Sequence, residues 1–125
     1  MSPEQLITCA LDIGEQMLLS GAEVGRVETS VKLICTAYGC SRTDVFTITS
    51  SIVVSIVSAE GVHMTQSRRI TGTATDLTRL DRLNSLSREI CRTTPEYAYV
   101  EEKIKDICAR KAFPLWVEAL ASALI

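Results

Sequence analysis

The stretch TDVFTITSSIVVSIVSAEGVHMTQSRRI, residues 43–70, predicts three consecutive β-strands. Residues 43–49 alternate between two faces, which is typical of a strand. Residues 52–57 form an almost continuous β-branched run, which predicts a central strand covered on both faces. The turn at 59–61 leads into a third strand over residues 62–70, so we expect an antiparallel meander.

Two amphipathic helices are predicted before these strands. The first begins with Ser2 as N-cap, Pro3 at the first helical position and Gln5 in place to complete a capping box, and it ends at Gly21. Its apolar stripe consists of Leu6, Ile7, Ala10, Leu11, Ile13, Met17 and Leu18. The second helix is expected over about residues 22–38.

Two more helices are predicted after the strands. One runs over about residues 77–92, capped by Thr75 or Asp76, and the last begins at the cap-plus-proline sequence 94–96. The buried side of the helix over 77–92 is expected to comprise Leu77, Leu80, Leu83, Ile90 and Cys91. The whole pattern predicts one α+β domain with two N-terminal helices, a three-stranded antiparallel sheet and two C-terminal helices.

Composition excludes several classes of protein. Thirteen basic and fifteen acidic residues give a net charge of −2, so we expect no nucleic-acid partner. Five cysteines without a C-x-x-C spacing, and one histidine, argue against a metal site or a disulfide framework and favour a reducing cytoplasm. No phosphate-binding loop or dinucleotide motif is found, so we expect no cofactor and no enzyme activity. The N-terminus has no signal-peptide pattern.

The last 14 residues, 112–125, are apolar almost throughout, and Glu118 is their only charge. A membrane span needs about 20 such residues, so this run cannot cross a bilayer alone. Basic residues precede it, as expected on the cytoplasmic side of a first span: Lys103, Lys105, Arg110 and Lys111. We therefore expect a soluble cytoplasmic domain over residues 1–111 and the beginning of a truncated membrane helix after it. The alternative is a short fifth helix that packs on the domain or on a twin subunit.

Several motifs, in order along the chain, carry a family resemblance. They are residues 18–28 (LLSGAEVGRVE), 44–49 (DVFTIT), 68–70 (RRI), 76–77 (DL) and 83–88 (LNSLSR). In these motifs the sequence resembles the N-terminal domain of the threonine/serine exporter family. The resemblance spans nearly the whole chain, and the ordered set is more specific than any one block.

The resemblance implies a cytoplasmic domain that is followed by several membrane helices and helps to export threonine and serine. A two-component branch, in which a small second membrane subunit is a separate chain, looks closer and is associated with succinate export. The expected partners are therefore the membrane, that second subunit and further copies of this chain. The expected location is the inner membrane, with this domain on the cytoplasmic side and a role in gating, regulation or assembly. The membrane helices that the resemblance implies are not among these 125 residues, so we do not expect this stretch to transport by itself.

Four candidate site residues lie in the first two matching motifs, 18–28 and 44–49. Glu23, Arg26 and Glu28 would form a polar constellation that gates or coordinates a small polar substrate, or that joins domains. The simpler interpretation is an i,i+3 ion pair between Glu23 and Arg26 on a solvated helix face, which contributes about 0.2–0.5 kcal/mol. Asp44 opens the first strand, where turn or cap chemistry is its default role.

The other four candidates lie later in the chain. Arg68 and Arg69 end the third strand and could pair with Glu23 or Glu28, or hold an anionic substrate bidentately. Asn84 and Ser87 fall inside an apolar helical arc, where a buried polar group without a hydrogen-bond partner costs about 1–3 kcal/mol.

Two alternatives belong to other functional classes. One is a free-standing interaction module that oligomerises through the apolar tail. The other is a small hydrolase, in which Ser50 or Ser51, His63 and Asp44 would form a triad, although no nucleophile-elbow motif supports it.

Overall fold

A computed structural model describes residues 1–48, 50–72 and 75–110. It confirms the predicted α+β plan. Its elements are α1 (Pro3–Leu19), α2 (Val24–Ala37), β1 (Arg42–Ile48), β2 (Ser51–Val57), β3 (His63–Arg69), α3 (Leu77–Thr93) and α4 (Tyr97–Arg110). The predicted start of a membrane helix, residues 112–125, lies outside the described residues. Within them, no helix is both long enough and apolar enough to cross a membrane.

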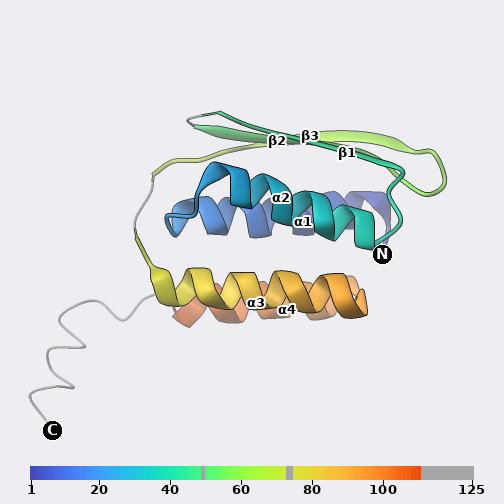
Figure 1. The fold of residues 1–125 in the computed structure, drawn as a ribbon. Coiled ribbons are helices and arrows are strands. Elements are labelled where there is room, and N and C mark those ends of the chain that lie inside the picture. Colours follow the sequence, from blue (N-terminus) through green and yellow to red (C-terminus); the bar gives the residue numbers. More distant parts are fainter. Residues whose placement is uncertain (49, 73–74, 111–125) are drawn as a thin grey trace, which may run out of the picture.

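The elements stack in three layers, with the sheet on one side, α1 and α2 in the middle, and α3 and α4 on the other side (Figure 1). The helices of each pair run antiparallel to each other. The sheet is the predicted antiparallel meander in the order β1-β2-β3. One row across its three strands is Phe46, Val53 and Ser67.

Among the described residues, the helices cover only one face of the sheet (Figure 1). Alternate residues of β2 are buried against them, namely Ile52, Val54 and Ile56. The residues between these, such as Val53, are only half-buried. The prediction that β2 is covered on both faces is therefore wrong. Valine on the outer face reflects the preference of β-branched side chains for a pleated, half-exposed surface rather than full burial.

Helix α1 occupies the centre of the fold, between the sheet and the second helix layer. Its predicted capping box is present: Gln5 N donates to Ser2 Oγ, and Ser2 N donates to Gln5 Oε1, each at 3.1 Å. All seven residues of the predicted stripe are buried, and Cys9 and Gly14 are buried as well. A Cβ at Gly14 would lie 3.0 Å from Ile52 Cδ1 and 3.1 Å from Val31 Cγ2. Glycine therefore permits the close approach of α1 to both α2 and β2.

Helix α3 begins as predicted and packs somewhat differently. Asp76 caps it by accepting a hydrogen bond from Arg79 N at 3.0 Å, and Thr94 ends it in the left-handed conformation with φ 41°. Leu77, predicted to be buried, is 71% exposed because it is the first residue of the helix, at the end of the domain. Leu86 is buried instead. Thr94 therefore closes α3 rather than beginning the next helix, which starts at Tyr97.

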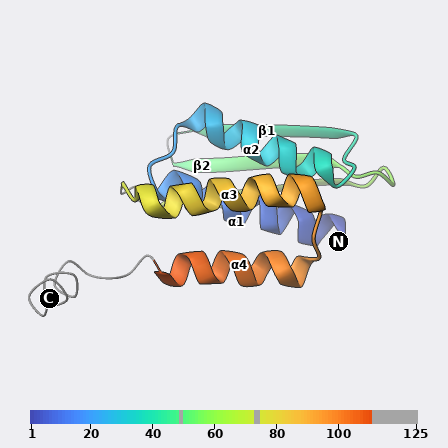
Figure 2. The same ribbon diagram turned by 60° about the horizontal axis from the view of Figure 1, so that its bottom comes forward.

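The C-terminal end of α4 lies at the same end of the domain as the α1–α2 turn, the β1–β2 turn and the start of α3 (Figures 1 and 2). We call this end the exit end. The β2–β3 turn lies at the opposite end. There the Tyr38 hydroxyl, just after α2, donates a hydrogen bond to the Pro95 carbonyl between α3 and α4.

Candidate functional site

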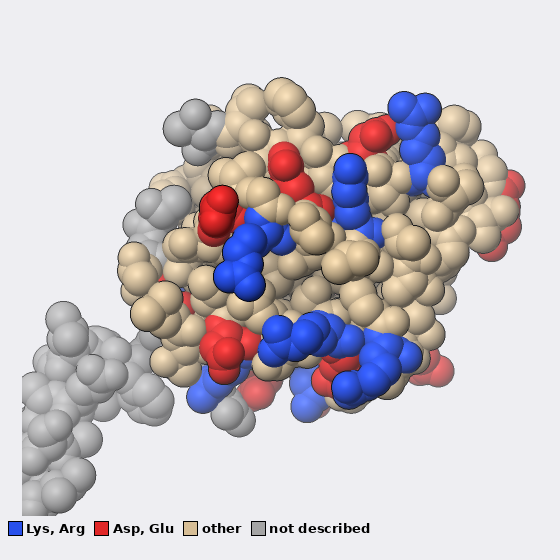
Figure 3. Space-filling view, in the orientation of Figure 1, with Lys and Arg blue, Asp and Glu red and all other residues tan. Residues whose placement is uncertain are grey.

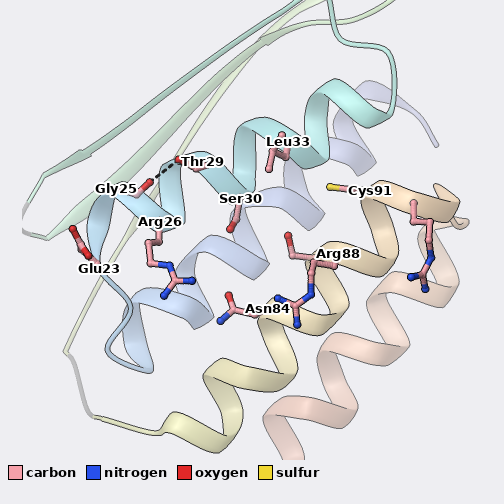
Figure 4. Close-up of a pocket in the computed structure, with 11 residues that line it drawn as sticks. Glu23, Gly25, Arg26, Thr29, Ser30, Leu33, Asn84, Arg88 and Cys91 are labelled. Carbon is pink, nitrogen blue, oxygen red and sulfur yellow. Dashed lines mark hydrogen bonds between the residues drawn. The ribbon is translucent and has the colours of Figure 1, made fainter.

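A groove of about 640 Å³ lies between α2 and α3 (Figure 4). Glu23 stands at the start of α2 and contributes to one end of the groove. Helix α2 itself contributes Gly25, Arg26, Thr29, Ser30 and Leu33. Helix α3 contributes Asn84, Ser87, Arg88, Cys91 and Arg92.

Four of the eight candidate site residues therefore meet in this groove, two from each helix. Glu23 and Arg26 come from the start of α2, and Asn84 and Ser87 come from the middle of α3. Nothing in the sequence paired these two sets, which are about 60 residues apart. The packing of α3 against α2 brings them together.

The groove carries an excess of positive charge. Three arginines line it, Arg26, Arg88 and Arg92, against one carboxylate, Glu23. Within the described part of the chain none of the three forms an ion pair, and Arg88 Nη2 donates only to Ser85 Oγ, at 3.3 Å. Basic side chains gather over α2 and α3 on this face of the molecule (Figure 3). The groove thus favours an anion, because guanidinium groups bind carboxylate and phosphate oxygens.

Asn84 and Ser87 line the groove without a hydrogen-bond partner among the described residues. Asn84 is half-buried, and Ser87 is only 6% exposed. The Ser87 hydroxyl and the Asn84 amide are therefore available to a water or a ligand in the groove. Among the described residues, neither side chain is hydrogen-bonded to the backbone of a neighbouring strand or loop.

Glu28 lies apart from the groove. Its Oε2 accepts a hydrogen bond from the backbone nitrogen of Thr47 at 3.0 Å. Strand β1 is at the edge of the sheet. Backbone N–H groups that face away from the neighbouring strand there need another hydrogen-bond acceptor. Glu28 therefore joins α2 to the free edge of β1.

Arg68 forms an ion pair, but its partners are not the predicted Glu23 or Glu28. Its guanidinium bonds to Asp12, and Nη1 lies 3.4 Å from Glu15 Oε1, so both partners come from α1. Burial alone lowers the pKa of Arg68, but the hydrogen bonds and negative charges of the two carboxylates outweigh it and raise that pKa. The pair joins β3 to the central helix.

The two remaining candidates lie on the open face of the sheet, away from the groove. Asp44 accepts from Arg42 Nε at 2.9 Å, and both side chains are largely exposed. Arg69 is exposed at the end of β3.

The residues of the imagined hydrolase triad lie far apart. In the sheet register, Ser51 pairs with Arg69, whereas His63 pairs with Val57. These two rows are separated by six residues of β2, or roughly 20 Å at about 3.3 Å per residue. A nucleophile and its base need hydrogen-bond contact, so this triad cannot form.

Sequence reasoning missed the buried Arg79 at the start of α3. Its Nη1 donates to Gln16 Oε1 at 2.9 Å, and its Nε lies 3.7 Å from Asp76 Oδ2. The backbone nitrogen of Asp76 also donates to Ser20 O at 3.0 Å. These contacts fix the start of α3 on the end of α1, and the i,i+3 spacing of Asp76 and Arg79 was the available signal.

Arg88 and Arg92 were also missed as groove residues. With Asn84 they form an i, i+4, i+8 series, which places all three on one face of α3. That spacing was visible in the sequence. The sequence did not indicate, however, that α2 would lie opposite this face of α3.

One comparison with known proteins found a match. Residues 8–125 match the model of the family described as "Putative threonine/serine exporter". Neither a curated protein nor a solved structure matches the chain.

Proposed function

Since the chain belongs to the threonine/serine exporter family, we propose that residues 1–111 form the N-terminal domain of a multi-span exporter of small polar metabolites. Family membership carries an export-related function and association with a membrane. In the proposal, residues 112–125 begin the first membrane helix, and the domain acts in gating, regulation or assembly. The cargo is threonine and serine, or a dicarboxylate such as succinate.

The observation that best supports this role is the apolar character of the exit end. Val24, Ile48 and Leu77 all lie at this end, and they are 44%, 51% and 71% exposed. Val24 and Ile48 also line a hollow of about 670 Å³ whose other lining residues are mostly apolar. Exposed large apolar side chains at one end of a domain are typical of a surface that another segment covers.

The position of α4 suggests what covers that surface. Its C-terminal end lies at the exit end, so a chain continuing from it begins at the same end of the domain as these residues. In the proposal the membrane segments of the exporter cover the exit end. This arrangement also places Glu23 and Arg26, at the start of α2, close to the membrane part. There they would join the domain to the transport pathway.

The proposal includes partners and a location. The domain lies on the cytoplasmic side of the inner membrane, and the exporter assembles with a small second membrane subunit and with further copies of this chain. Five free cysteines are compatible with the reducing cytoplasm.

Two measurements test the proposed function. The first is the gene sequence beyond codon 125, which should continue into apolar segments of about 20 residues. The second is efflux of labelled threonine, serine and succinate from preloaded cells, with and without the gene. We expect slower efflux of at least one of these solutes after deletion, restored by a plasmid copy. Unchanged efflux of all three would contradict an exporter of these metabolites.

A free-standing oligomerising module is the second candidate. The open face of the sheet favours it, because Phe46 is 64% exposed there and lies two residues from Ile48. Sedimentation of the chain with and without residues 112–125 separates the two candidates. The exporter domain should become monomeric and more soluble without the tail, whereas a module that uses the sheet face should remain oligomeric.

A further inference from the structure

We infer that the α2–α3 groove binds a small dianion, whose acidic oxygens contact guanidinium groups from both helices. This inference rests on the proposed function only in that the groove belongs to a domain that we propose to be part of an exporter. The groove's own lining residues and their charges carry the inference. No nucleic acid, membrane or protein segment is needed to occupy it.

The first step is the placement of like charges across the groove. Arg26 projects from α2 toward α3, Arg88 stands on α3, and Asn84 lies between them (Figure 4). Neither arginine has an ion-pair partner among the described residues. Like charges across a shared space repel, and an anion between them removes that repulsion. A ligand with two acidic groups can meet a guanidinium on each wall.

The second step is the pair of unused polar side chains on α3. Ser87 is more than nine-tenths buried, lines the groove, and has no hydrogen-bond partner among the described residues. Asn84 is half-buried and is likewise without a partner there. The Ser87 hydroxyl and the Asn84 amide can both donate to acidic oxygens. A bound anion would therefore supply the acceptor that the protein does not.

The third step distinguishes a dianion from a zwitterion. A carboxylate is the strongest partner for the ammonium group of an amino acid, and Glu23 is the one carboxylate among the described residues that line the groove. Figure 4 shows its side chain directed away from Arg26 and Asn84. The backbone N–H groups at the start of α2 add partial positive charge near Gly25, and the Glu23 side chain does not cap them. The groove therefore offers a net positive charge, and its carboxylate, Glu23, is directed away from Arg26 and Asn84.

The test is calorimetric titration of the 125-residue chain with three probes. Sodium succinate represents a dicarboxylate ligand, inorganic phosphate represents a phosphate ligand, and serine represents a zwitterionic amino acid. We expect at least one dianion to bind ten-fold or more tightly than serine, and the better one identifies the source. No binding by either dianion, or serine binding equally well, overturns the inference.

Variants locate the bound anion. Arg26→Gln and Arg88→Gln should each weaken dianion binding at least five-fold, whereas Arg69→Gln, an exposed arginine on the open face of the sheet, should change it less than two-fold. Ser87→Ala should weaken binding without lowering the melting temperature of the free protein, because that side chain has no internal partner to lose. Equal weakening by Arg69→Gln, or unchanged binding in Arg26→Gln and Arg88→Gln, would show general charge attraction and overturn the site.

Failure of this inference is distinguishable from failure of the proposed function. Slower efflux after gene deletion, together with no dianion binding to the chain, overturns the groove ligand alone. Dianion binding with unchanged efflux supports the groove ligand and contradicts the export function.

Discussion

Glu28→Ala tests whether this residue of the family motif is structural. In the structure, Glu28 Oε2 accepts a hydrogen bond at 3.0 Å from the backbone nitrogen of Thr47, on the free edge of β1. The substitution leaves that backbone donor without its acceptor. We therefore expect a less stable domain, with no change in anion binding to the groove, which Glu28 does not line.

The magnitude follows from the kind of hydrogen bond that is lost. A hydrogen bond to a charged group contributes about 1.5–3 kcal/mol, and this one is only partly buried, so water can replace some of it. We expect Glu28→Ala to lower the free energy of unfolding by about 1.5 kcal/mol. In a domain of this size each kcal/mol corresponds to roughly 4 °C in melting temperature. Glu28→Gln keeps an acceptor oxygen and should cost less than about 1 kcal/mol.

Urea denaturation of the 125-residue chain, followed by circular dichroism, measures these free energies. Glu23→Ala is the matched control, because this glutamate of the same motif is exposed and makes no side-chain cap. It should change stability by less than about 0.5 kcal/mol. If Glu28→Ala is no less stable than Glu23→Ala, the link to Thr47 does not hold the edge strand and the argument is refuted.

Three further predictions concern stability. Gly14→Ala should lower the free energy of unfolding by about 1 kcal/mol, because crowding against two confined methyl groups outweighs the helix preference of alanine. Gly25→Ala has open space around it and should raise the free energy of unfolding by about 0.5 kcal/mol. Chemical denaturation of both variants measures the difference. Burial raises the pKa of the Cys9 and Cys35 thiols from 9.0 to about 12. Above pH 9 the unfolded chain loses these protons while the folded chain keeps them, so the free energy of unfolding falls by about 1.4 kcal/mol per thiol and pH unit. Below pH 9 the two thiols cause no such loss. Unfolding curves between pH 8 and 11 should show this fall, and Cys35→Ala should make its slope shallower by about 1.4 kcal/mol per pH unit. A flat profile would contradict the prediction. Arg68→Gln should cost about 1–2 kcal/mol, and neutralising its aspartate partner on α1 as well should recover part of that loss in a double-mutant cycle.

The order and type of the elements could be predicted because their signals are local. The capping box of Ser2 and Gln5 involves residues three positions apart, and the β-branched run of β2 is continuous in the chain. Such patterns depend on helical or strand geometry alone. The predicted burial of the α1 stripe was confirmed for the same reason, because the apolar spacing along one helix is a local pattern.

Placement in three dimensions could not be predicted in the same way. Leu77 has the residue type and spacing of a core position, yet it lies beyond the edge of the packed layers. Arg68 pairs with carboxylates on α1 rather than with those on α2, because β3 contacts α1. These outcomes depend on which elements become neighbours, and that information is not local.

The candidate site was predictable in part for a geometric reason. Arg26 and Glu28 are two residues apart, so about 200° separates them around α2, and only one of them can face α3. The structure assigns Arg26 to the groove and Glu28 to β1. The helical arc of α3 indicated that Asn84 and Ser87 share one face, but not that α2 would lie opposite.

The most direct test of the account measures efflux by the full-length exporter with a charge placed at the exit end. Leu77→Asp alters an exposed side chain at that end, and Val62→Asp alters one beside the β2–β3 turn at the other end. With equal amounts of protein in the membrane, we predict that Leu77→Asp reduces efflux several-fold and that Val62→Asp leaves it unchanged. If both variants keep normal efflux, or if both lose it to the same extent, the claim that the domain works through its exit end is contradicted.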